Sequence, residues 1–173
     1  MKTLVTVALT LISFHISLAQ YDPNYEPEET PSIVNFGLGI GLNYGGIGGR
    51  VEVVPVKNFA IFAAAGFNFH KLGYNVGGKL RILPDKKACP ILAGMYGYNG
   101  VIIVAGAEQY NKTYYGGSIG GGVELKVGRD RNFMEFGLII PFRPKEFDDD
   151  LNNIRNQGID ISDPLPFAIS FGY

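Results

Sequence analysis

The feature that most restricts the fold of this chain is an alternation of apolar residues with small or polar ones, which begins near Ile33 and recurs up to Tyr173. Successive side chains of a β-strand point to opposite faces, so a period of two indicates strands with one apolar face. The alternation is sharpest in 33–44, 74–82, 115–127, 134–142 and 165–173, weaker in 47–56 and 59–69, and weakest in 90–99. The pattern predicts about eight strands of about ten residues, the length of a tilted bilayer-spanning strand.

The two faces of these predicted strands differ in size as well as in polarity. In the first segment the apolar face consists of Val34, Phe36, Leu38, Ile40, Leu42 and Tyr44. The opposite face consists of Asn35, Gly37, Gly39, Gly41 and Asn43. Glycine accounts for 24 of the 173 residues, about twice its usual share. Small residues suit the crowded interior of a narrow barrel, so we expect this face to point inward and the apolar face to point outward.

The connections between the predicted strands alternate in length. Short polar turns are predicted at 57–58, 84–89 and 128–131, and the links on the other side at 45–46, 70–73, 100–114 and 143–164. Short turns at one end and mostly longer loops at the other are typical of transmembrane β-barrels. The sequence therefore predicts an all-β fold, a closed antiparallel transmembrane β-barrel of about eight strands with meander (up-and-down) topology.

The few charged residues of the strands fall on the face that is predicted to line the barrel. They are Arg50, Glu52, Lys79, Arg81, Glu124, Lys126 and Glu135. Four cations and three anions nearly cancel, as charges enclosed in a protein must, because unpaired buried charge is costly. We predict that they form a charge network in the lumen. A barrel of about eight strands leaves room only for side chains, which favours a closed plug over the alternative, a narrow polar path.

The N-terminal residues form a predicted export signal. A positive start, Met1–Thr3, precedes a mostly apolar run from Leu4 to Leu18, and small residues at Ser17 and Ala19 suit cleavage before Gln20. We therefore predict a signal peptide at 1–19. The segment 20–32 is rich in proline and glutamate and is predicted to be a disordered leader, which leaves 33–173 as the barrel domain.

Aromatic residues gather near the predicted strand ends, as they do in the interfacial belts of membrane barrels. Those toward the longer loops are Tyr44, Phe69, Tyr74, Tyr98, Tyr114, Tyr115 and Phe142. Phe59 and Tyr173 lie toward the short turns.

Together, the signal peptide, the alternating strands and an aromatic-ended final segment, 167–173, resemble the small outer-membrane β-barrel protein family of Gram-negative bacteria. The resemblance implies an outer-membrane location and contact with outer-membrane lipids. It also implies that the barrel-assembly machinery reads the last strand, through Phe167, Ile169, Phe171 and Tyr173. This chain ends in Tyr where the family more commonly has Phe.

Several residues of reactive type are better explained without catalysis. His70 is predicted in a solvated loop and Cys89, the single cysteine, in a turn; neither has an assured partner for nucleophilic chemistry. The aspartates of the last loop, Asp148, Asp149, Asp150, Asp160 and Asp163, match no EF-hand spacing. The Gly-x-Gly patterns lie inside strands and open no helix. We expect no catalytic residue, no metal and no cofactor, and the net charge of −1 argues against nucleic-acid binding.

The resulting functional hypothesis is a non-enzymatic outer-membrane protein that is anchored by its apolar wall. The loops 100–114 and 143–164 would present a surface for envelope integrity or for a ligand that the sequence does not identify. Three alternatives stay open: a narrow pore or small-solute path through the lumen, a secreted soluble barrel that binds lipid inside, and a lipid-modifying enzyme that depends on His70.

Overall fold

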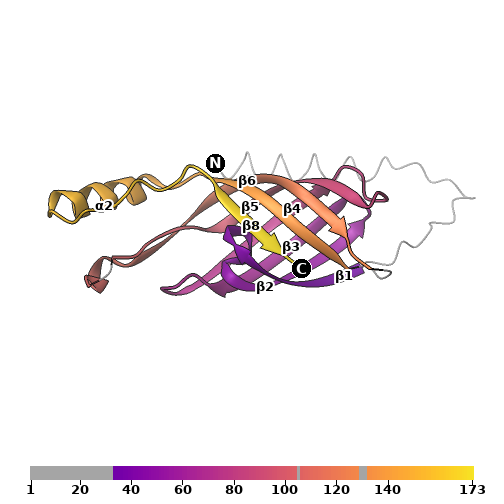
Figure 1. The fold of residues 1–173 in the computed structure, drawn as a ribbon, viewed down its shortest axis with the longest axis horizontal. Helices are drawn as coiled ribbons and strands as arrows, with labels where there is room; N and C mark the ends of the chain where they lie inside the picture. Colours follow the sequence, from indigo (N-terminus) through magenta and orange to yellow (C-terminus); the bar gives the residue numbers. More distant parts are fainter. Residues whose placement is uncertain (1–32, 105, 129–131) are drawn as a thin grey trace, which may run out of the picture. The chain divides into compact units, whose positions relative to one another are not determined.

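The computed structural model describes residues 33–104, 106–128 and 132–173, and the predicted signal peptide and leader lie outside them. These residues form a closed barrel of eight strands in sequence order (Figure 1). The strands are β1 (Ile33–Gly41), β2 (Gly46–Val56), β3 (Phe59–Phe67), β4 (Leu72–Arg81), β5 (Ala88–Ile102), β6 (Lys112–Lys126), β7 (Phe133–Pro141) and β8 (Ala168–Gly172). Each neighbouring pair is antiparallel. The predicted all-β meander barrel is confirmed.

The barrel closes where β8 meets β1. Gly172 pairs with Gly39 and Phe171 with Ile40. Leu38 and Tyr173 extend this pairing because each donates its backbone N–H to the carbonyl of the other, at 2.7 and 2.8 Å. Over these residues the first and last strands each have a hydrogen-bonding neighbour on both sides, whereas this pairing does not extend to the first residues of β1, 33–37.

The alternation of the sequence becomes an alternation of exposure. Every second residue of β3 is buried and its neighbours are exposed. The outer wall carries large apolar side chains, with Phe36 79%, Leu38 73% and Ile169 72% exposed. The inner face carries mainly glycine, alanine and polar side chains, among them Ala60 and Asn75, together with a few large apolar ones such as Phe62 and Met95. The faces therefore point as the sequence predicted, apolar outward and small or polar inward.

The first strand is shorter than predicted, because the chain turns into the barrel after Gly41. Leu42–Tyr44 form a 3-10 helix, η1, and all three of its side chains are buried. Gly41, Gly45 and Gly46 have φ values of 133°, 72° and 114°, a region in which a Cβ is disfavoured. The prediction that Leu42 and Tyr44 belong to the outward face, and that Tyr44 is a rim aromatic, is wrong for this reason.

At the two longer links of this end, more of the chain is regular than predicted. β5 and β6 extend into the predicted loop 100–114, which shrinks to 103–111 and includes a short 3-10 helix, η2 (Glu108–Tyr110). The predicted loop 143–164 contains helix α2 (Lys145–Asn156). No helix among the described residues is long and apolar enough to cross a membrane.

Helix α2 packs on the extended β5–β6 hairpin and forms a small apolar core with it. The buried members are Ile102, Val104, Tyr114, Phe147, Leu151 and Ile154. Lys112 pairs with Glu146 at 2.8 Å and with Asp150 at 2.6 Å, and the Tyr114 hydroxyl donates to Asp150 at 2.8 Å. Tyr114 is therefore a buried residue under α2 rather than an exposed rim aromatic.

Candidate functional site

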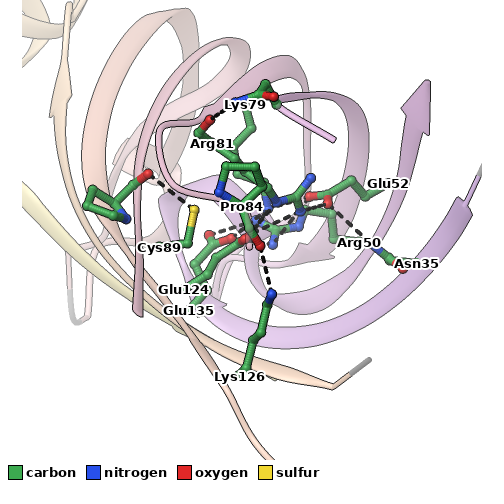
Figure 2. Close-up of polar contacts among 12 residues, drawn as sticks. Asn35, Arg50, Glu52, Lys79, Arg81, Pro84, Cys89, Glu124, Lys126 and Glu135 are labelled. Atoms are coloured by element: carbon green, nitrogen blue, oxygen red, sulfur yellow. Dashed lines mark hydrogen bonds and ion pairs between the residues drawn. The ribbon is translucent and has the colours of Figure 1, made fainter. Parts of the chain in front are cut away.

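Six charged side chains meet inside the barrel and are the most distinctive polar cluster of the described residues (Figure 2). They come from four strands: Arg50 and Glu52 from β2, Lys79 and Arg81 from β4, Glu124 from β6 and Glu135 from β7. On β2 and β4 the two members are separated by two positions, so both point to the same face. All six are buried, with at most 7% of the residue exposed.

Lys79 is the centre of this network, because its ammonium group contacts all three carboxylates. Its Nζ lies 2.5 Å from Glu52 Oε2 and 3.0 Å from Glu135 Oε2, and it also contacts Glu124. A Lys ammonium carries three donors, which matches three carboxylate partners.

The two guanidinium groups flank this centre. Arg50 binds Glu135 with two parallel hydrogen bonds, Nη1–Oε1 at 2.8 Å and Nη2–Oε2 at 2.6 Å. Arg81 donates from Nε to Glu124 Oε2 at 2.7 Å and also pairs with Glu52. Each guanidinium thus holds at least one carboxylate that Lys79 also contacts, and the six charges form one continuous group.

Lys126, the seventh predicted member, does not join the network. It is exposed, and its Nζ donates to the Pro84 carbonyl at 2.7 Å (Figure 2). Lys126 has the same strand parity as Glu124, but it is the last residue of β6 and lies at the barrel end. This corrects the predicted four cations and three anions to three of each, so the enclosed charges cancel.

Residues of η1 connect the network to the barrel wall. Asn43 Nδ2 donates to Glu135 Oε1 at 3.0 Å, and Asn75 Nδ2 donates to the Leu42 carbonyl at 2.6 Å. The Arg50 guanidinium lies 4.7 Å from the centroid of the Tyr44 ring, within cation–π range. Sequence analysis missed Asn43 and Tyr44 as site residues; the signal was their position between Gly41 and the pair Gly45–Gly46.

Two cavities of very different size lie against the network. The cavity enclosed among Asn43, Arg50, Met95, Glu135 and Ser170 measures about 20 Å³, close to the volume that one water molecule needs. A second cavity, of about 760 Å³, is lined by the beginnings of β1 and β7 and by part of β2, and Arg50 and Glu52 form part of its polar lining. The small cavity leaves room for about one water molecule beside the network, whereas the larger one reaches Arg50 and Glu52.

The other predicted residues of interest are separate from this site. His70 is partly buried in the β3–β4 link. Cys89 is the second residue of β5 and is buried facing inward, not in a turn as predicted. Asp150 is held by Lys112 and Tyr114, and Asp163 pairs with Arg155 at 2.6 Å. The described residues contain no group of three or more His, Cys, Asp or Glu that could hold a metal ion.

The four residues predicted to be read during assembly all lie on the outer surface. Phe167, Ile169, Phe171 and Tyr173 are each exposed, and the ring of Phe171 lies 5.0 Å from that of Phe136 on β7. The shared face follows from the alternation of β8. Their role in assembly stays a prediction.

Comparison with known proteins assigns no family: no protein-family model matches the chain, and no curated protein matches it significantly. The geometry of the barrel and its interior is therefore the basis for inferring a function.

Proposed function

We propose that the protein is a non-enzymatic outer-membrane β-barrel of a Gram-negative bacterium, exported through its N-terminal signal peptide. Its outer wall contacts outer-membrane lipids, and its longer loops present a surface on the extracellular side of that membrane. One observation carries the proposal: the strands turn their large apolar side chains outward and their charges inward. A soluble barrel has the opposite arrangement, because water solvates charge and apolar side chains fill its core.

The composition of the outer wall supports a hydrocarbon environment. Thirty-two large apolar or aromatic side chains are exposed among the described residues, and they occur on all eight strands. Soluble monomers rarely expose continuous apolar patches above a few hundred Å². Within lipid, each unpaired backbone group costs several kcal/mol, and a closed barrel avoids that cost.

The filled interior favours an anchoring or structural role over conduction. Six mutually paired charges and η1 occupy the lumen, and the cavity among them is about 20 Å³. The alternative, a narrow pore, requires a continuous water path past this level. The soluble lipid-binding alternative requires a roomy apolar interior, whereas the lumen at this level holds the charged network, and its apolar side chains, such as Phe62 and Met95, are packed in a buried cluster.

The β5–β6 extension and α2 are the part of the chain best suited to present a surface. Their shared apolar core and the Lys112 ion pairs fix one face of α2 against the hairpin. The exposed side of α2 includes Asp148, Asp149, Asn152 and Asn153. A fixed, polar helix face offers a defined surface to an extracellular partner.

For assembly, we propose that the barrel-assembly machinery engages the outward face of β8. Its exposed apolar side chains support this step. Replacing Phe171 by Ser should slow assembly in cells, whereas replacing Phe69 by Ser in the β3–β4 link should not.

The decisive experiment is membrane fractionation of the full-length chain. We expect recovery in the outer-membrane fraction, resistance to extraction by alkaline or urea washes, and release by detergent. Recovery in the soluble fraction without detergent would contradict the proposal and support the soluble barrel. Planar-bilayer recording then separates anchor from pore: we expect no channel conductance, and steady conductance would favour the pore.

A further inference from the structure

We propose that the short-turn end of the barrel binds the phosphate groups of anionic phospholipids through a cluster of four lysines. The cluster, called the lysine rim below, consists of Lys57, Lys86, Lys87 and Lys126. All four side chains are exposed. The inference rests on the proposed membrane location and adds a specific lipid class to it.

Contacts between three turns bring these lysines together. Lys57, in the β2–β3 turn, lies 3.7 Å from Asp85 in the β4–β5 turn. Lys126, at the end of β6, donates its backbone N–H to the Lys87 carbonyl at 2.8 Å and its Nζ to the Pro84 carbonyl at 2.7 Å. The lysines are thus neighbours on one surface although they are far apart in sequence.

The lysine rim keeps most of its positive charge. Asp85 is the single acidic residue among the described residues of these turns, and its pair with Lys57 is weak, because the two side chains are 79% and 66% exposed. The hydrogen bond from Lys126 to a neutral carbonyl leaves its charge uncompensated. Among the described residues of these turns, four ammonium groups therefore face one carboxylate.

The two ends of the barrel differ in sign. Among the described residues, the loop end carries more acidic than basic groups. Its cations are Lys71, Lys112, Arg143, Lys145 and Arg155, and its anions are Glu108, Glu146, Asp148, Asp149, Asp150, Asp160 and Asp163. The network inside the barrel is neutral. Positive charge is therefore concentrated at the short-turn end.

The surface next to the lysine rim determines which anion fits. Ile82, Leu83 and Val127 are exposed directly beside the lysines, at 50%, 47% and 37%. An occupant that covers both surfaces needs an anionic group next to hydrocarbon, which is the chemistry of an anionic phospholipid. Lysine side chains suit this boundary, because their stems lie along apolar surface while the ammonium reaches the headgroups.

The absence of tryptophan from the sequence makes a clean fluorescence test possible. A Leu83→Trp substitution places a probe beside the lysine rim, and the full-length protein is reconstituted in phosphatidylcholine vesicles. Quenching by brominated phosphatidylglycerol and by brominated phosphatidylcholine then gives the relative association of the two headgroups at this site. We expect a preference for phosphatidylglycerol on the order of threefold at low salt, and its loss at 1 M salt, where the Debye length is about 3 Å.

Two matched double variants test the assignment to the lysine rim. Lys86→Gln with Lys87→Gln should remove most of the preference. Lys71→Gln with Lys145→Gln makes the same change in net charge at the loop end and should leave the preference intact. Equal loss in both variants, or no preference in the parent, would overturn the inference.

A second probe keeps this inference distinguishable from the proposed function. Leu138→Trp lies on the outer wall of β7, at a position 50% exposed, and should be quenched equally by both brominated lipids. Quenching there without headgroup preference at Leu83→Trp overturns the lysine rim and leaves the membrane location intact. If neither probe is quenched and the chain is recovered without detergent, both proposals fail.

Discussion

Replacing Lys79 by Met tests whether the interior charges act as one balanced group. Lys79 is 1% exposed and contacts Glu52, Glu124 and Glu135. Its loss leaves three buried carboxylates opposite two guanidiniums. Breaking a buried ion pair by removing one partner costs about 3–5 kcal/mol, because the remaining charge is uncompensated. We expect a loss of folding stability in this range.

A compensating change should recover part of that loss. Glu124→Gln in the Lys79→Met background restores two cations and two anions. The remaining groups can form two pairs, since Arg50 already binds Glu135 and Arg81 already contacts Glu52. We expect the double variant to be more stable than the sum of the two single changes predicts, with a coupling energy of roughly 1–3 kcal/mol.

The assay is urea unfolding of the full-length protein from lipid vesicles, followed by electrophoretic mobility of unheated samples. Lys71→Met is the matched control, because it removes the same charge from an exposed position outside the network and outside the lysine rim; surface changes of this kind stay within about 0.5 kcal/mol. Equal effects of Lys79→Met and Lys71→Met, or a strictly additive double variant, would refute the balanced network.

Three further predictions address the wall, the seam and the loops. Leu138→Arg should lower the free energy of unfolding in lipid by about 2–4 kcal/mol if the outer wall of β7 lies near mid-bilayer. Leu165→Arg, at a position exposed outside the strands, should have little effect. Equal losses in the two variants would contradict a position of Leu138 near mid-bilayer. Gly172→Ala should destabilise the barrel because its Cβ would meet the Tyr44 hydroxyl and ring. The same change should cost less in a Tyr44→Ala background, and an equal cost in both backgrounds would point to the backbone. Hydrogen bonds from Lys112 and then Tyr114 hold the pKa of Asp150 below its usual range, and bonds to Asp150 and Glu146 raise the pKa of Lys112. The docking of α2 should therefore be strongest between roughly pH 4 and pH 10. The docking should weaken as pH falls through the lowered pKa of Asp150 or rises through the raised pKa of Lys112. Hydrogen exchange of the α2 amides measures the docking, and Asp150→Asn should remove most of its dependence on low pH.

The sequence predicted which way the strand residues point, because parity along a strand is a local property. Arg50, Glu52, Lys79 and Arg81 were placed on the inner face by alternation alone. Alternation does not show how far along the barrel a residue lies, however. Lys126 is on the same face of β6 as Glu124 but lies at the end of that strand. Whether a charged residue is enclosed depends on where its strand ends, and the turn contacts determine that point.

The missed elements have a different physical cause. Leu42 and Tyr44 continue the apolar parity of β1, so alternation could not reveal η1; the change of direction depends on the φ of Gly41 and Gly45. In α2, Phe147, Leu151 and Ile154 do follow helical spacing. Their burial depends on the β5–β6 hairpin, a tertiary partner that a short, strongly acidic segment does not indicate by itself.

Part of the high glycine content follows from what the lumen contains. A Cβ at Gly39 or Gly172 would collide with the Tyr44 ring, and one at Gly77 would collide with Phe62 and Met95. These glycines make room for large inward side chains, and Tyr44 in turn packs against Arg50. At other wall glycines, such as Gly48 and Gly122, a Cβ would instead meet backbone atoms of the neighbouring strand. The wall glycines around Tyr44, η1 and the balanced charges are therefore parts of one packed interior. Substitutions in these three parts should change the stability of the barrel non-additively.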